Sequence, residues 1–317
     1  MRVAASLAAY AIVLAVAAPW VLSRLTRSGR APRLGVAAWM LACAGAVGSW
    51  VFAGLVLLTP RAVPEANLGR LLSACITVVE QALDTPRSGA AWLAGLAASL
   101  AVAGRVLWCL ASAAVTAHRQ RAGHRETLRM VGRPAPGGIP ATILDADRPV
   151  VYCLPGRPAS VVVSSAALAA LDGPQLSAVL AHERAHLAGR HHLALIALRS
   201  LRRALPFLPL FRSAAAEVAR LLEMRADDVA ARRHAGTAIA QALLALSDRP
   251  APVAAIGAGG PTATARALRL VEPASLPNRA RAAAALSLTV AALATGPAFA
   301  SSLPLLAHLG HQWCPLL

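Results

Sequence analysis

The chain has 317 residues, of which 57% are hydrophobic and only 14% are charged, whereas an ordinary soluble domain carries about 25% charged residues. This deficit predicts a membrane protein. The formal net charge is +17, but aromatic residues make up only 4% of the chain and no basic stripe is interleaved with them. We therefore expect the arginines to orient membrane segments and expect no nucleic-acid partner.

Four apolar runs are long enough to cross a membrane, because each supplies the roughly 20 apolar residues that span hydrocarbon. The alternative for the first run is a cleaved signal peptide. Arginines follow this run rather than precede it, which favours a retained span. The expected parts are spans at about 3–23, 34–59 and 89–112 within residues 1–117, and a fourth span with a short outer tail within 282–317.

Arginine clusters alternate with the spans and predict the orientation of the chain. One cluster lies at 24–33, and two more lie near the ends of the long segment 118–281. Cytoplasmic loops carry the excess of arginine, so these regions are expected inside and the outer loop 61–88 outside. The prediction is a multi-pass protein of the cell membrane with both termini outside and 118–281 in the cytoplasm.

Two shorter apolar stretches lie between or beside the spans. Apolar residues between positions 68 and 83 recur at helical spacing, so this stretch is expected to form a helix on the outer membrane face. Residues 203–211, "RALPFLPLF", are too short to span. They either dock the domain on the inner leaflet or form a core turn between two helices.

The cytoplasmic segment is expected to be an α+β domain. Its residues 130–165 contain β-branched runs bounded by proline and glycine, which predict short strands. The pattern then changes, because Asp172 is a good N-cap, Pro174 suits a first helical turn, and "QLSAVLAHERAHLA" contains no helix breaker. A helix is therefore expected to carry "HERAH", which has the form H-E-x-x-H.

This H-E-x-x-H string predicts a zinc site. His182 and His186 are four residues apart, so both imidazoles project from one helix face and can reach one tetrahedral Zn²⁺. Glu183 borders the same cleft and is placed to take a proton from a water molecule. Burying these three groups in an otherwise apolar helix without a partner would be costly.

The third zinc ligand has two candidate sources. Read through Gly189 and His192, the string also spells the longer metzincin signature, in which His192 completes the site. That alternative requires a secreted enzyme and a methionine turn, and the sequence supplies neither. We therefore expect His192 to point away from the metal.

A later helical stretch, "EMRAD", offers the second source. Glu223 and Asp227 are four residues apart, a spacing at which two like charges destabilise a helix unless a positive partner lies beside them. We predict that Glu223 binds the metal and that Asp227 orients a ligand histidine. The alternative is a solvated face neutralised by Arg220 or Arg225. Weaker candidates on this stretch are Glu217, Asp228 and His234.

"HERAH" followed a few dozen residues later by "EMRAD" resembles the gluzincin membrane peptidases, and the surrounding residues resemble most the family of β-lactam-sensing signal transducers. The resemblance implies three spans, a cytoplasmic zinc domain and a fourth span, with zinc on His182, His186 and Glu223 and with Glu183 as the general base. The heat-shock and prenyl-protein membrane proteases share both motifs and are the nearest rival family. A short tail without an S-x-x-K motif follows the fourth span, so β-lactam sensing is not expected.

The predicted fold is mainly α and membrane-bound, with four transmembrane helices and a cytoplasmic α+β zinc-peptidase domain inserted between spans three and four. The predicted function is an integral-membrane zinc metalloendopeptidase with one Zn²⁺ that cleaves a cytoplasmic or membrane-proximal protein. A cytosolic transcriptional repressor in a signalling circuit is one candidate substrate. The alternatives are a quality-control peptidase of the heat-shock or prenyl-protease kind and a non-cleaving membrane signal transducer. The expected partners are the protein substrate and the lipid bilayer.

Overall fold

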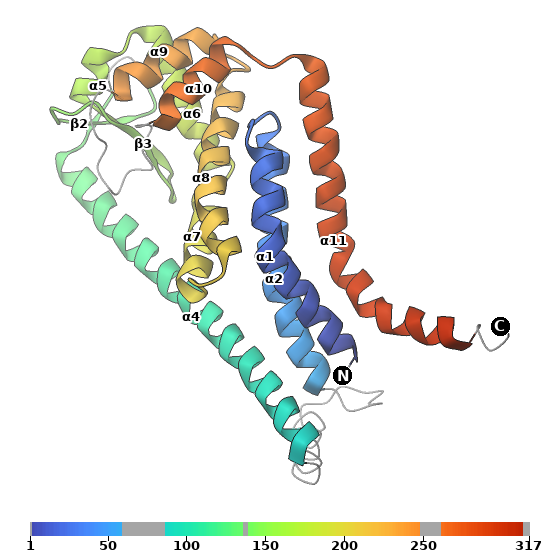
Figure 1. Cartoon of the computed structure of the whole chain (residues 1–317). Helices are drawn as coiled ribbons and strands as arrows, with labels where there is room; N and C mark the ends of the chain where they lie inside the picture. The colour runs from blue at the N-terminus through green and yellow to red at the C-terminus, as the bar shows by residue number, and fades with distance from the viewer. Residues whose placement is uncertain (1, 59–85, 136–138, 248–260, 313–317) are drawn as a thin grey trace.

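The computed structural model describes residues 2–58, 86–135, 139–247 and 261–312 (Figure 1). Four of its helices are long and apolar enough to cross a membrane, which confirms the mainly helical membrane fold. They are α1 (Arg2–Thr26), α2 (Pro32–Leu58), α4 (Pro86–Val131) and α11 (Leu276–Gln312). The helix predicted at 68–83 and the last residues of the predicted outer tail lie outside the described residues.

Helix α4 is longer than the predicted third span. The span was expected to end at 112, but the helix continues to Val131 and contains 46 residues. Beyond the span its residues are mostly alanine, arginine and other good helix formers, with no proline to end it. At about 1.5 Å per residue α4 is about 69 Å long, so it extends well past a hydrocarbon core of about 30 Å and carries the chain to the sheet.

A small mixed sheet follows α4 and confirms the strands predicted between 130 and 165. Strand β4 is central, with buried Val161, Val162 and Val163. It pairs in parallel with β2 and antiparallel with β3, so β3 is an edge strand. The strands are β1 (Arg133–Pro134), β2 (Thr142–Leu144), β3 (Val151–Leu154) and β4 (Ser160–Ser164), in the order β1-β2-β4-β3.

Helix α6 begins where the sequence predicts. Asp172 and Gln175 form a reciprocal capping box, in which Gln175 N donates to Asp172 Oδ1 at 2.8 Å and Asp172 N donates to Gln175 Oε1 at 3.2 Å. Pro174 occupies the first turn. The helices after the sheet are α5 (Ser165–Ala170), α6 (Gly173–Ala188), α7 (His191–Ala204), α8 (Pro209–Ala230), α9 (Gly236–Ser247) and α10 (Pro261–Val271).

Helices α7 and α8 form a hairpin that packs against the membrane helices (Figure 1). Residues 205–208, within the apolar stretch 203–211, form the turn of this hairpin, and Phe207 in the turn is 72% exposed. Phe211, in the first turn of α8, is buried in one hydrophobic core with Trp39 of α2. Arg105 of α4 donates its Nε–H to the carbonyl oxygen of Ala204 at 2.6 Å and so caps the end of α7. This packing anchors α8, which carries part of the candidate site, to the spans.

Candidate metal centre

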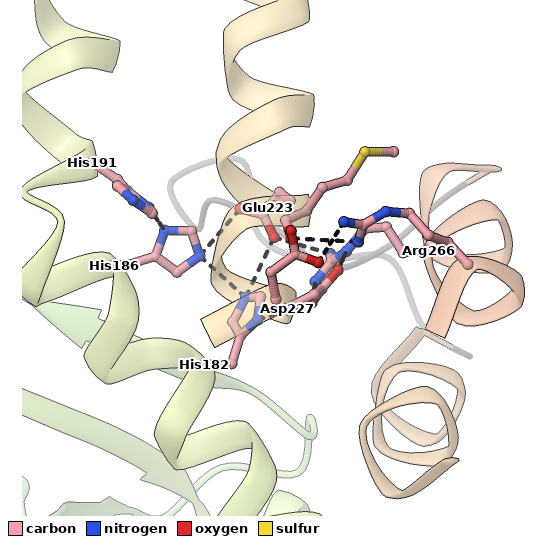
Figure 2. Close-up of polar contacts among 9 residues, drawn as sticks. His182, His186, His191, Glu223, Asp227 and Arg266 are labelled. Carbon is pink, nitrogen blue, oxygen red and sulfur yellow. Dashed lines mark hydrogen bonds and ion pairs between the residues drawn. The ribbon is translucent and has the colours of Figure 1, made fainter. Parts of the chain in front are cut away.

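Helices α6 and α8 bring three predicted ligands together (Figure 2). Ligand atoms of His182, His186 and Glu223 all lie within 4.8 Å of one another. The two Nε2 atoms are 3.1 Å apart, and the carboxylate oxygens of Glu223 lie 3.4 Å from His186 Nε2 and 3.6 Å from His182 Nε2. A tetrahedral zinc ion with ligands at about 2.0–2.1 Å holds its ligand atoms about 3.3 Å apart. The spacing therefore fits one zinc ion.

Burial and donor type also fit zinc. The two histidines are only 7% and 8% exposed. Glu223 Oε1 is buried and has no hydrogen-bond partner among the described residues, which is costly for a carboxylate unless another group satisfies it. Two imidazoles and one carboxylate are a zinc donor set that leaves a fourth position for a water molecule or substrate.

Glu183 lies beside the three ligand candidates but is not part of their cluster. It is partly buried and lies against Cys153 on the edge strand β3. Burial raises the pKa of Glu183, and the nearby Glu223 carboxylate adds to this effect while His182 opposes it. A carboxylate with a raised pKa is better able to carry a proton near neutral pH.

Asp227 lies next to His182, on the side of the Nδ1 atom. Its Oδ1 is 3.0 Å from His182 Nδ1, so His182 keeps its Nε2 for the cluster. Burial lowers the pKa of His182, but Asp227 and Glu223 outweigh this effect and raise the pKa to about 9. Burial lowers the pKa of His186 to about 3. Burial acts to raise the pKa of Asp227, but Arg266 and His182 outweigh it and hold that pKa well below its usual range.

Arg266 of α10 is a component of the site that the sequence analysis missed. It is 1% exposed, and its Nε and Nη2 atoms donate to the two carboxylate oxygens of Asp227 at 2.8 and 2.7 Å. Its Nη1 lies 2.9 Å from Glu223 Oε2. The cation that neutralises the acidic pair is thus Arg266, and not Arg220 or Arg225 as the alternative supposed. One signal was available: this arginine lies between alanines that form the apolar face of α10.

The weaker candidates on α8 have other partners. Glu217 forms an ion pair with Arg220 at 2.7 Å, and Asp228 forms one with Arg269. His234 lies beyond the end of α8. None of these three residues belongs to the cluster that could hold a metal.

The turn after α6 places His191, and not His192, next to the cluster. His191 Nδ1 lies 2.8 Å from His186 Nδ1, whereas His192 lies outside the metal cluster. The chain reverses at Arg190, which has a left-handed φ of 48°. A Cβ on Gly189 would lie 2.3 Å from His191 Nε2, so the absence of a side chain at Gly189 leaves room for the His191 ring. Each histidine of the cluster thus directs Nε2 inward and presents Nδ1 to a polar neighbour, the arrangement usual for metal-binding histidines.

The segment that contains α6 and α8 has a known counterpart. Residues 114–247 match the model of peptidase family M48. The M48 match begins within α4 and ends with α9, so it includes the sheet and the histidine–glutamate cluster but not Arg266. It supports a membrane zinc metalloprotease and agrees with the predicted relationship to the gluzincin membrane peptidases. Comparisons with curated proteins and with solved structures gave no match.

Proposed function

We propose that the chain is an integral-membrane zinc metalloendopeptidase in which His182, His186 and Glu223 hold one Zn²⁺. The observation that carries the proposal is the buried cluster of these three side chains on two facing helices, with ligand atoms spaced as zinc ligands are. The M48 match covers the same helices and supports the assignment. Zinc content measured on the native protein and on variants of the three ligands tests it.

Glu183 is the proposed general base. A zinc ion bound in such a site lowers the pKa of a water molecule and polarises a peptide carbonyl. Glu183 accepts the proton of the attacking water and passes it to the leaving amine. Its raised pKa favours both transfers near neutral pH, because the carboxyl group can hold the proton between them.

Asp227 and Arg266 are the proposed positioning residues. Asp227 fixes the ring of His182 through Nδ1, and Arg266 holds the Asp227 carboxylate with two parallel N–H groups. Arg266 also contacts one oxygen of Glu223 and leaves the other directed toward His186. Together these contacts hold His182 and Glu223 in the orientation that a metal needs. Groups that hydrogen-bond to metal ligands in this way strongly affect metal affinity.

The edge strand β3 is the proposed binding edge for an extended peptide. Its side away from β4 has no strand partner among the described residues. Cys153, within this strand, contacts Glu183. A peptide that adds to this edge through main-chain hydrogen bonds would pass beside the proposed base. This placement supports an endopeptidase that binds and cleaves an unfolded or flexible segment of a protein substrate.

We further propose that the peptidase domain, residues 118–281, is cytoplasmic and that both termini lie outside, as the arginine distribution predicts. The substrate is then a cytoplasmic or membrane-proximal protein, with a transcriptional repressor as the first candidate. The alternatives are quality-control cleavage of membrane proteins and signalling without cleavage. Trapping partners with the Glu183→Gln protein and identifying them by mass spectrometry tests this proposal. A single soluble regulator favours signalling, and a broad set of misfolded membrane proteins favours quality control.

A further inference from the structure

A basic cavity lies away from the metal centre, between the α1–α2 connection and the beginning of α11. Its volume is about 580 Å³, within the range of about 300–1,000 Å³ that is typical of small-ligand sites. Two segments that are far apart in the sequence line it. The polar lining consists of Arg24, Arg27, Ser28, Arg30, Asn278 and Arg281.

The charge of this cavity is unbalanced. Four guanidinium groups line it and no carboxylate does. Within the parts of the chain that the structure describes, none of the four forms an ion pair, whereas Arg220, Arg266 and Arg269 each pair with an acid. Four like charges around one concavity repel one another and attract an anion. The hydroxyl of Ser28 and the amide of Asn278 add hydrogen-bond donors.

The neighbouring residues place the cavity at the membrane surface. Trp20 precedes Arg24 by one helical turn and is 62% exposed, with the Arg24 guanidinium carbon 3.7 Å from its ring centroid. Exposed tryptophan on a membrane helix marks the headgroup level. Val16 of α1 and Leu288 of α11 lie further along their helices from the cavity than Trp20 and Arg281 do. They are 63% and 73% exposed and offer apolar surface to lipid chains. The α1–α2 connection, which lines the cavity, lies at the end of α1 nearer to α8 and α10 of the peptidase domain (Figure 1).

We propose that this cavity binds the headgroup phosphate of an anionic phospholipid from the leaflet on the peptidase side. Guanidinium groups bind phosphate oxygens through paired, charge-assisted hydrogen bonds. The phosphate of an anionic lipid is not neutralised within the headgroup, so its full negative charge can interact with the arginines. In a zwitterionic lipid the headgroup amine neutralises that charge. The bound lipid links the α1–α2 connection to α11 and thereby fixes the fourth span against the first.

The test is native mass spectrometry of the full-length protein in detergent with added dioleoylphosphatidylglycerol. The variant combines Arg27→Gln, Arg30→Gln and Arg281→Gln, and it spares Arg24 because that side chain stacks on Trp20. Each arginine near a membrane surface changes affinity for anionic lipid about fivefold, so the variant should bind about 100-fold more weakly. The matched control replaces three exposed arginines elsewhere in the chain by glutamine and should bind like the native protein; these are Arg148, Arg232 and Arg233.

Three further measurements separate the alternatives. Dioleoylphosphatidylcholine should bind at least tenfold more weakly than the anionic lipid and should not distinguish the variants. A large excess of inorganic phosphate should not displace the lipid; full displacement would assign the cavity to a soluble anion and overturn the proposal. Equal weakening in the control variant would also overturn it, because the effect would then be one of net charge. If the triple variant does not fold, Arg27→Ala and Arg281→Ala should each weaken binding about fivefold.

Discussion

Replacing Arg266 with methionine tests whether α10 is part of the metal site. Methionine keeps much of the side-chain volume and removes the guanidinium group. Asp227 is 0% exposed and would keep its charge without the partner that now donates two hydrogen bonds to it. Removing one partner of such a buried pair costs about 3–5 kcal/mol of folding free energy. For a domain of this size the loss corresponds to a fall in melting temperature of about 6–20 °C.

Thermal unfolding of the purified protein in detergent measures this effect, with Arg269→Met as the matched control. Arg269 lies one turn further along α10 and pairs with Asp228, but the two side chains are 17% and 40% exposed. A partly exposed pair of this kind contributes only about 0–1 kcal/mol. The double variant Asp227→Asn, Arg266→Met should be less destabilised than Arg266→Met alone, because no uncompensated charge remains on Asp227. If Arg266→Met and Arg269→Met melt within a few degrees of each other, the buried network is not as described.

Three further predictions concern the mechanism and the topology. Glu183→Gln should retain zinc and lose proteolysis by at least 100-fold, because the glutamate is a base and not a ligand; normal cleavage by this variant would disprove the mechanism. Glu223→Ala should release zinc from the purified protein while His192→Ala should retain it, as metal analysis by mass spectrometry will show; the metzincin alternative requires the reverse. Reporter fusions after residues 28, 75 and 150 should report inside, outside and inside, and an outside signal at 150 would refute the cytoplasmic placement.

Local patterns in the sequence were sufficient to predict much of the fold. The four apolar runs became four long helices. Asp172 and Pro174 marked the start of α6 correctly, because capping depends on residues only a few positions apart. The proximity of His182, His186 and Glu223 was also predicted. Helical spacing puts the two histidines on one face of α6 and the two acids on one face of α8, and these polar faces can be buried only if they meet.

Contacts between distant segments could not be predicted in the same way. Arg266 follows Asp227 by 39 positions, and no local pattern states which acid an arginine on α10 will meet. The H-x-x-G-x-x-H spacing points to His192 and not to His191, because no local pattern predicts the left-handed backbone at Arg190 that orients the start of α7. The packing of the α7–α8 hairpin against α1 and α2 is likewise a tertiary feature.

Zinc-edge anomalous diffraction from crystals of the full-length protein is the most direct test of the proposed metal site. We predict one anomalous peak about 2 Å from the Nε2 atoms of His182 and His186 and from one carboxylate oxygen of Glu223. Asp227 should remain within hydrogen-bond distance of His182 Nδ1. A zinc peak coordinated by His192, with Glu223 turned toward solvent, would contradict the account, and so would a zinc-loaded crystal with no peak between α6 and α8.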